Sequence, residues 1–292
     1  MKRFFILATA AIVALASCAK TEVVYKDAPE EIVLKTVNMP MTKAAYDQNL
    51  GVAAYKLDGT SYFPVTEFTL SSNVWTGGQF WPLDTKLAFV GYGPFDGATG
   101  VEITTSVGRP NGMIVTGVES DVDFVYSVYV DNSGAGYGKG AEVPMPLYHT
   151  KAKIVINVQN GSNETVTKVE LLEPNDGGNC TITFPDHVTW NGYTNTNDFD
   201  FTSVNTHYVV PGTPTTLRIT YDSAEPAKTG LTAEIALADE TMYDSEGNEV
   251  TGAATWKAGY SYRYDVTIQS ELITIKATEA AWTEQTNIVP EP

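Results

Sequence analysis

Alternation of apolar and polar side chains is the strongest regularity along this chain. Apolar residues recur at every second position in seven runs: residues 52–57, 87–92, 122–130, 154–158, 217–221, 231–237 and 260–268. A period of two places successive side chains on opposite faces of a β-strand. No run of about 12 or more residues carries an apolar stripe at helical spacing, and Gly and Pro interrupt the chain at short intervals. The pattern predicts an all-β protein made of β-sandwiches.

The run at residues 86–92 differs from the others because both of its faces are apolar. Leu87 and Phe89 alternate with Ala88 and Val90, and Gly93-Pro94 follows the run. A strand that is apolar on both sides lies in the centre of a fold or is covered by another segment. We therefore expect its aromatic neighbours to pack in a core rather than to stack on sugars.

A change in composition near residue 145 predicts a division of the chain. Residues 131–140 are rich in Gly, Asn and Ser, which is typical of a loop, and Pro144 and Pro146 then favour extended backbone. The Gly-rich stretch lacks the Gly-Lys-Ser/Thr ending of a phosphate-binding loop. We expect one β-sandwich over residues 44–145 and a second over residues 146–292.

The first residues have the layout of an export signal. Lys2 and Arg3 precede a short apolar run, and small residues lead to Cys18. The run is shorter than the roughly 20 residues that span a bilayer. The sequence Leu15-Ala16-Ser17-Cys18 resembles the lipobox of bacterial lipoproteins, which implies a signal peptide at residues 1–17 and acyl chains such as palmitate on Cys18. Ordinary secretion would leave Cys18 without a role.

Charge and cysteine content narrow the function further. The chain carries 18 basic and 35 acidic residues, a formal net charge of −17, and no basic stripe, which argues against nucleic acid as a partner. Cys180 has no partner for a disulfide once Cys18 is acylated. It alternates with Ile182 and Phe184 in a strand-like run, so we expect a buried thiol.

No catalytic, metal or cofactor site is predicted. His149, His187 and His207 are far apart and lack metal-ligand or triad spacing. We interpret Asp121 and Asp123 as solvated residues on one strand face. Residues 195–200 and 244–249 cluster oxygen ligands but lack the flanks of a helix-loop-helix calcium site, so Asx-rich turns are favoured there. The sequence does not predict an enzyme.

Several motifs in order resemble one family. They are Thr42-Lys43-Ala44, residues 50–55 (LGVAAY), Trp75, residues 80–84 (FWPLD), residues 87–94 (LAFVGYGP), residues 145–154 (MPLYHTKAKI), residues 256–264 (WKAGYSYRY) and Trp282. In this order behind a lipobox, they resemble the fimbrillin family, the Mfa-like type V pilins.

The resemblance implies two tandem transthyretin-like β-sandwiches and a structural subunit of surface fimbriae at the outer membrane, with a part in adhesion and biofilm. It also implies that a trypsin-like protease cuts between Lys43 and Ala44. That cut would remove residues 18–43, which include a first strand at residues 31–39 with Ile32, Leu34 and Thr36 on one face. The groove would then accept a donor strand from another fimbrial subunit, with residues 272–275 and the tail at 286–292 as the candidate donor.

An alternative from another class is a monomeric surface lipoprotein that binds glycan or host protein through its loops. Tyr137 and Tyr193 lie in segments that would serve such binding. Lys43 would then be an ordinary solvated lysine.

Overall fold

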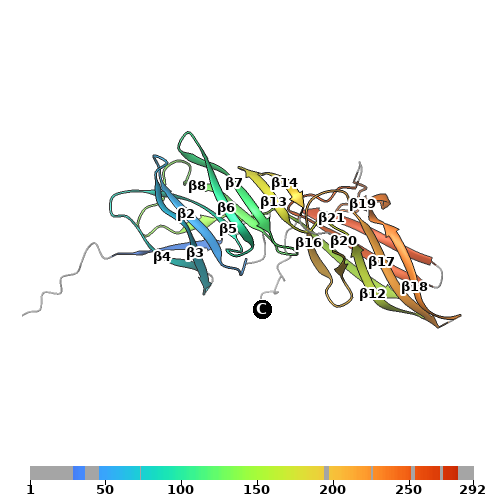
Figure 1. The fold of residues 1–292 in the computed structure, drawn as a ribbon. Helices are drawn as coiled ribbons and strands as arrows, with labels where there is room; N and C mark the ends of the chain where they lie inside the picture. Colours follow the sequence, from blue (N-terminus) through green and yellow to red (C-terminus); the bar gives the residue numbers. More distant parts are fainter. Residues whose placement is uncertain are drawn as a thin grey trace, which may run out of the picture.

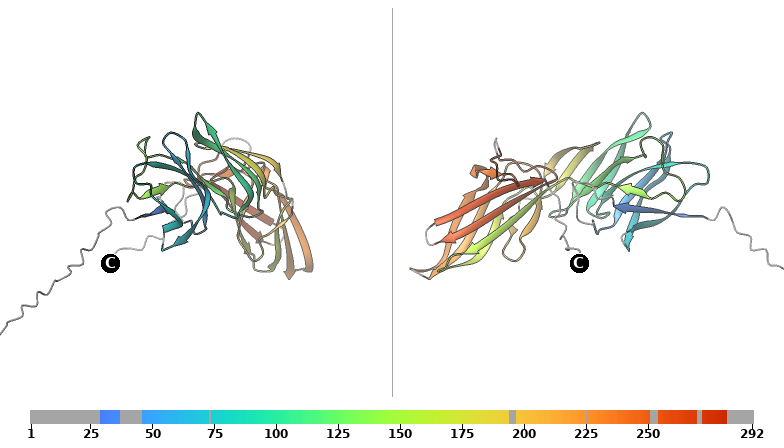
Figure 2. Two further views of the ribbon diagram at one scale, coloured as in Figure 1. Left: turned by 60° about the vertical axis from the view of Figure 1, so that its left-hand side comes forward. Right: turned by 180° about the vertical axis from the view of Figure 1, so that it is seen from behind.

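The chain folds into strands and turns, as its alternation predicts. The computed structural model describes residues 29–36, 46–72, 74–193, 197–224, 226–250, 254–269 and 272–281. Over these residues the structure contains β-strands and one short 3₁₀ turn, η1 (Leu237–Asp239), and no α-helix. None of the described segments forms a helix with the length and hydrophobicity of a membrane span. The all-β class is therefore confirmed, and the strands gather into two lobes placed end to end (Figures 1 and 2).

The first lobe contains two sheets. The larger has eight strands in the order β10-β8-β5-β2-β3-β4-β1-β9, and the smaller has the order β14-β13-β7-β6. The bounds in the larger sheet are β1 (Glu31–Thr36), β2 (Leu50–Lys56), β3 (Ser61–Ser71), β4 (Val74–Phe80), β5 (Leu87–Gly93), β8 (Val125–Val130), β9 (Val143–Met145) and β10 (Tyr148–His149). The smaller sheet consists of β6 (Ala98–Ser106), β7 (Arg109–Val118), β13 (Gly178–Thr183) and β14 (His187–Tyr193).

Strand β5 is buried along its whole length, which confirms the interpretation of its two apolar faces. Leu87 and Phe89 pack into the cluster that also contains Trp75 and Trp81. Val90 and Tyr92 belong to a second cluster with Met113, Val115 and Ile182 on the smaller sheet. The central strands thus separate two cores within one lobe, because both faces of β5 carry side chains that leave water.

The hairpin β13–β14 joins the first lobe although it follows the expected boundary in sequence. Strand β13 pairs antiparallel with β7, with Cys180 opposite Val115 and Ile182 opposite Met113. Cys180 is buried, as expected. The division near residue 145 stays a prediction, and this pairing adds that one hairpin beyond it completes a sheet of the first lobe.

The second lobe is also built of two sheets, with strand orders β16-β11-β20-β21-β19 and β15-β12-β17-β18. Their bounds are β11 (Ala152–Asn160), β12 (Glu164–Leu172), β15 (Phe199–Asp200), β16 (Thr206–Val209), β17 (Thr216–Ala224), β18 (Ala227–Ala236), β19 (Met242–Tyr243), β20 (Tyr260–Gln269) and β21 (Leu272–Ala281). One cluster between the sheets includes Trp256, Tyr262 and Tyr264. The Trp256 indole donates to the Tyr264 hydroxyl at 2.9 Å, so the polar atoms of this aromatic core are paired.

Among the described strands, the chain passes between the lobes three times. Strands β10, β13 and β14 belong to the first lobe, whereas β11, β12 and β15 belong to the second, so the crossings lie between β10 and β11, β12 and β13, and β14 and β15. Several connections therefore hold the lobes next to each other.

Candidate assembly site around the first strand

Strand β1 lies between two other strands of the large sheet rather than at its edge. It pairs antiparallel with β4, with Leu34 opposite Trp75. On its other side it pairs parallel with β9, with Leu34 opposite Val143 and Thr36 opposite Met145. The backbone of β1 thus bridges β4 and β9, which do not pair with each other in the sheet order.

Burial on β1 follows the predicted alternation. Ile32 and Leu34 are completely buried, whereas Val33 and Lys35 are partly exposed. The side chain of Thr36 lies outside the described residues. Burying an Ile or Leu side chain contributes about 1.5–3 kcal/mol, so these two residues supply most of the apolar contact that holds β1 in place.

The contact between β1 and β9 is short. It spans three paired positions, and the middle residue of β9, Pro144, has no backbone N–H to donate. At the surface, Lys35 forms an ion pair with Glu142, and both side chains are substantially exposed. Ion pairs of this kind contribute little to stability. This side of β1 is accordingly held more by packing than by polar bonds.

The beginning of β1 is tied to the end of β4. The Trp81 N–H donates to the Glu30 carbonyl at 2.9 Å, and the Gly78 N–H donates to the Glu31 carboxylate at 3.0 Å. The register shifts between Glu31 and Val33, which marks a bulge. The strand is therefore seated by a few bonds at one end and by two buried side chains along its length.

The residues predicted for lipidation and cleavage, Cys18, Lys43 and Ala44, lie outside the described residues, as do Trp282 and the tail at 286–292. Their roles stay predictions. The described chain stops at Thr36 and resumes at Tyr46, so Lys43 belongs to the connection between β1 and β2.

The apolar part of the expected donor is a paired strand in this structure. Residues 272–275 belong to β21, which pairs antiparallel with β20 along its whole length, from Gln269 opposite Leu272 to Tyr260 opposite Ala281. To act as a donor, these residues would have to leave their own lobe.

The structure pairs two of the histidines with the two aspartates. The expectation that Asp121 and Asp123 sit on a strand face is wrong, because β7 ends at Val118 and β8 begins at Val125, so both lie in the connection between these strands. Asp123 contacts the His149 Nδ1 at 2.8 Å, and Asp121 contacts the His207 Nδ1 at 2.7 Å. Sequence spacing could not reveal the second pair, because its members are 86 residues apart.

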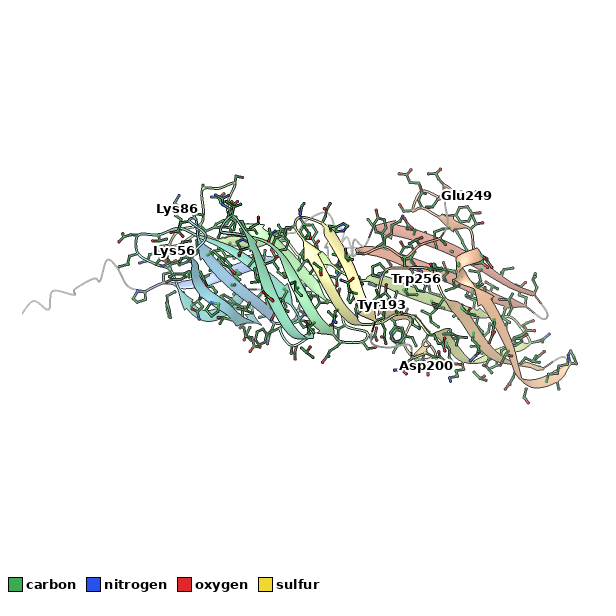
Figure 3. The ribbon with its side chains drawn as sticks, turned by 45° about the horizontal axis from the view of Figure 1, so that its top comes forward. Lys56, Lys86, Tyr193, Asp200, Glu249 and Trp256 are labelled. Atoms are coloured by element: carbon green, nitrogen blue, oxygen red, sulfur yellow. The ribbon has the colours of Figure 1, made fainter. Side chains whose placement is uncertain are left out.

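The two tyrosines considered for ligand binding, Tyr137 and Tyr193, differ in their contacts and in their exposure. The backbone of Tyr137 exchanges two hydrogen bonds of 2.8 Å with Leu87, and its ring packs near Phe89. Tyr193, at the end of β14, is 52% exposed and lies where the two lobes approach each other (Figure 3). Tyr193 is thus the more exposed of the two tyrosines, whereas Tyr137 is partly buried.

The acidic turn at residues 244–249 binds its own backbone. The Asp244 carboxylate accepts hydrogen bonds from the N–H groups of Glu246 and Asn248 at 2.9 and 2.8 Å. These bonds lower the pKa of Asp244, the Asn248 contacts most of all. This is the Asx-rich turn that the sequence favoured, and no group of three potential metal ligands occurs in the described part of the chain.

Comparison with known proteins identifies the class of this two-lobed all-β chain. The fimbrillin-like family matches residues 38–282, and the chain belongs to that family. No curated protein matches it. Among solved structures, a candidate cell adhesion protein from Bacteroides uniformis is 15% identical with a TM-score of 0.58, covering 88% of this chain and 99% of its own. A fimbrial protein from Bacteroides vulgatus is 15% identical with a TM-score of 0.54, covering 87% and 99%. At this identity the two structures share the fold.

Proposed function

We propose that the chain is a structural subunit of surface fimbriae that is first held at the outer membrane by lipid on Cys18 and that, once residues 18–43 are cut away, assembles by strand exchange at the position of β1. Membership of the fimbrillin-like family supports a fimbrial or adhesion subunit. The observation that carries the exchange step is the place of β1 between β4 and β9, with Ile32 and Leu34 fully buried.

Removal of β1 would create an acceptor for another strand. It would leave unpaired backbone on β4 and β9 and an apolar slot lined by Trp75, Val143 and Met145. Unpaired strand edges beside an apolar slot are relieved by adding a strand. A donor would need apolar residues at alternating positions to refill the places of Ile32 and Leu34.

Cleavage after Lys43 by a trypsin-like protease would release β1, because Lys43 lies in the connection from β1 to β2. The decisive measurement is the N-terminal sequence of protein sheared from cells. An N-terminus at Ala44 supports cleavage, whereas chains that still begin at acylated Cys18 support an uncleaved anchor subunit or a monomeric lipoprotein.

Two substitutions at one position separate processing from side-chain packing. Lys43→Ala removes the basic residue that a trypsin-like protease needs, and Lys43→Arg keeps it. We expect filaments to be lost or shortened with Lys43→Ala and retained with Lys43→Arg. Equal filament length and equal mature size in both variants would contradict the processing step.

The lipid anchor is tested separately. We expect Cys18→Ser to release the protein from the outer-membrane fraction or to leave the signal peptide uncut. A Cys18→Ser protein that remains in the membrane fraction at its mature size would place the anchor elsewhere.

A further inference from the structure

A turn of the first lobe reaches across the junction to a strand of the second lobe. The turn follows β7 and contains Asp121, whose carboxylate has two partners on β16. Its Oδ2 contacts the His207 Nδ1 at 2.7 Å, and its Oδ1 accepts the Tyr208 backbone N–H at 2.9 Å. One carboxylate thus engages two consecutive residues of the other lobe.

The backbone of Asp121 is in an uncommon conformation. Its φ angle is 52°, in the left-handed region that non-glycine residues rarely adopt and that Asp tolerates better than most. Strained backbone of this kind persists where the surroundings hold it. Here the two bonds to His207 and Tyr208 are the contacts that the conformation makes possible.

His207 is enclosed on the side of the second lobe. Its ring stacks on Phe199 with a centroid distance of 4.6 Å and meets the edge of Phe201 at 4.5 Å. Its side chain is 11% exposed. The Nε2 atom lies 3.2 Å from the Asp200 carbonyl oxygen. Both ring nitrogens therefore face acceptors, and only the protonated imidazolium has an N–H for each.

We propose that Asp121 and His207 form a proton-dependent latch that clamps the two lobes together when His207 is protonated and loosens when it is neutral. The three chain crossings keep the lobes adjacent in both states, so the latch sets how tightly the faces are held. This inference concerns the isolated chain and does not depend on the fimbrial function.

The charges around His207 favour the protonated state. Burial alone would lower the pKa of His207, but the hydrogen bond and negative charge of Asp121, together with the Asp200 carbonyl and carboxylate, outweigh it and raise the pKa. On that side, the positive charge of Lys168 interacts with the Asp200 carboxylate. A raised pKa means that the clamping is fully present below the ordinary histidine pKa of about 6.5 and is lost as pH rises through the higher value in the folded protein.

Lys151 also lies at the junction, and its pKa limits the pH range over which His207 can be tested. It is completely buried, and its ammonium donates to the Glu119 carbonyl at 2.8 Å and to the Asp176 carbonyl. Burial lowers its pKa to about 8, against the opposing charges of Asp176, Asp121 and Asp123. Lys151 therefore begins to lose its proton at the upper end of the range used for the measurement, about pH 5 to 7.5, and any pH dependence that remains in His207→Gln is assigned to Lys151.

The matched control is His149, because its partner Asp123 lies two residues after Asp121 in the connection between β7 and β8. His149 is on β10, which pairs with β8 in the first lobe, so the contact of His149 with Asp123 stays within one lobe. His149 also lines a small cavity with Ala258 and Gly259 of the second lobe, so this control tests whether the bond to Asp121, rather than a position near the junction, sets the clamping.

The test measures the distance between two spin labels, one on each lobe, at about pH 5 and at about pH 7.5. Exposed Glu102 on β6 and Thr232 on β18 are replaced by Cys in the full chain carrying Cys18→Ser. Buried Cys180 remains unlabelled, since burial raises the pKa of its thiol to about 12. We expect a narrow distance distribution at low pH and a broader one at high pH, both unchanged by His149→Gln.

His207→Gln should give the broad distribution at both pH values. Asp121→Asn serves as a second variant if His207→Gln does not fold; it should remove the pH dependence and lower the pKa of His207 measured by NMR. The proposal is overturned if the distribution in the unmodified chain is the same at both pH values. It is equally overturned if Asp121→Asn retains the full pH dependence, or if His149→Gln abolishes it.

Discussion

Truncating Leu34 tests whether packing holds β1 in its place. The residue is completely buried and packs in the cluster that contains Trp75, Val143 and Met145. Removing a buried Leu side chain costs its transfer free energy plus the cost of the cavity, together about 2–5 kcal/mol. Since domains of this kind are stable by about 5–15 kcal/mol, Leu34→Ala should leave a folded protein with a much weaker first strand.

The measurement is amide exchange of the peptide covering residues 29–36, together with urea unfolding of the whole chain. If β1 opens locally, a loss of 2 kcal/mol or more should speed its exchange by at least about tenfold, because about 1.4 kcal/mol corresponds to a factor of ten. The same substitution should make β1 easier to displace by a donor strand.

Lys35→Ala is the matched control on the same strand. It removes the exposed ion pair with Glu142, which is expected to contribute about 0–1 kcal/mol. If Leu34→Ala destabilised β1 no more than Lys35→Ala does, the argument that two buried side chains seat the strand would be wrong.

Three further outcomes are expected. Lys151→Ala should destabilise the chain by about 1–3 kcal/mol for each buried carbonyl left without a donor, measured by urea unfolding at about pH 7; no loss would mean that water replaces the ammonium. The free energy of unfolding should fall as pH rises through the raised pKa of His207, and this slope should disappear in Asp121→Asn. Cys180 should resist thiol reagents in the full chain but react in a fragment that starts at residue 144, because that fragment lacks β7; a protected thiol there would indicate that the second half folds with its hairpin covered by other residues.

The local patterns in the sequence predicted much of the fold. Three predictions follow from which side chains avoid water: that both faces of β5 are apolar and buried, that Cys180 is buried, and that Ile32 and Leu34 share the buried face of β1. Each is confirmed. Features made by residues close together in the sequence were also predicted correctly, such as the Asx-rich turn around Asp244. These features depend on neighbours within a few residues, so the order of residues suffices to predict them.

Features that join distant segments were not predictable in this way. Alternation shows which face of a strand is buried, but it does not name the neighbouring strand, because any apolar face can cover any other. The position of β1 between β4 and β9 and the pairing of β13 with β7 were therefore decided by packing in three dimensions. The same holds for Asp121 and His207: the sequence indicates a solvated acid and a structural histidine in a strand, and only the fold brings the two within hydrogen-bonding distance.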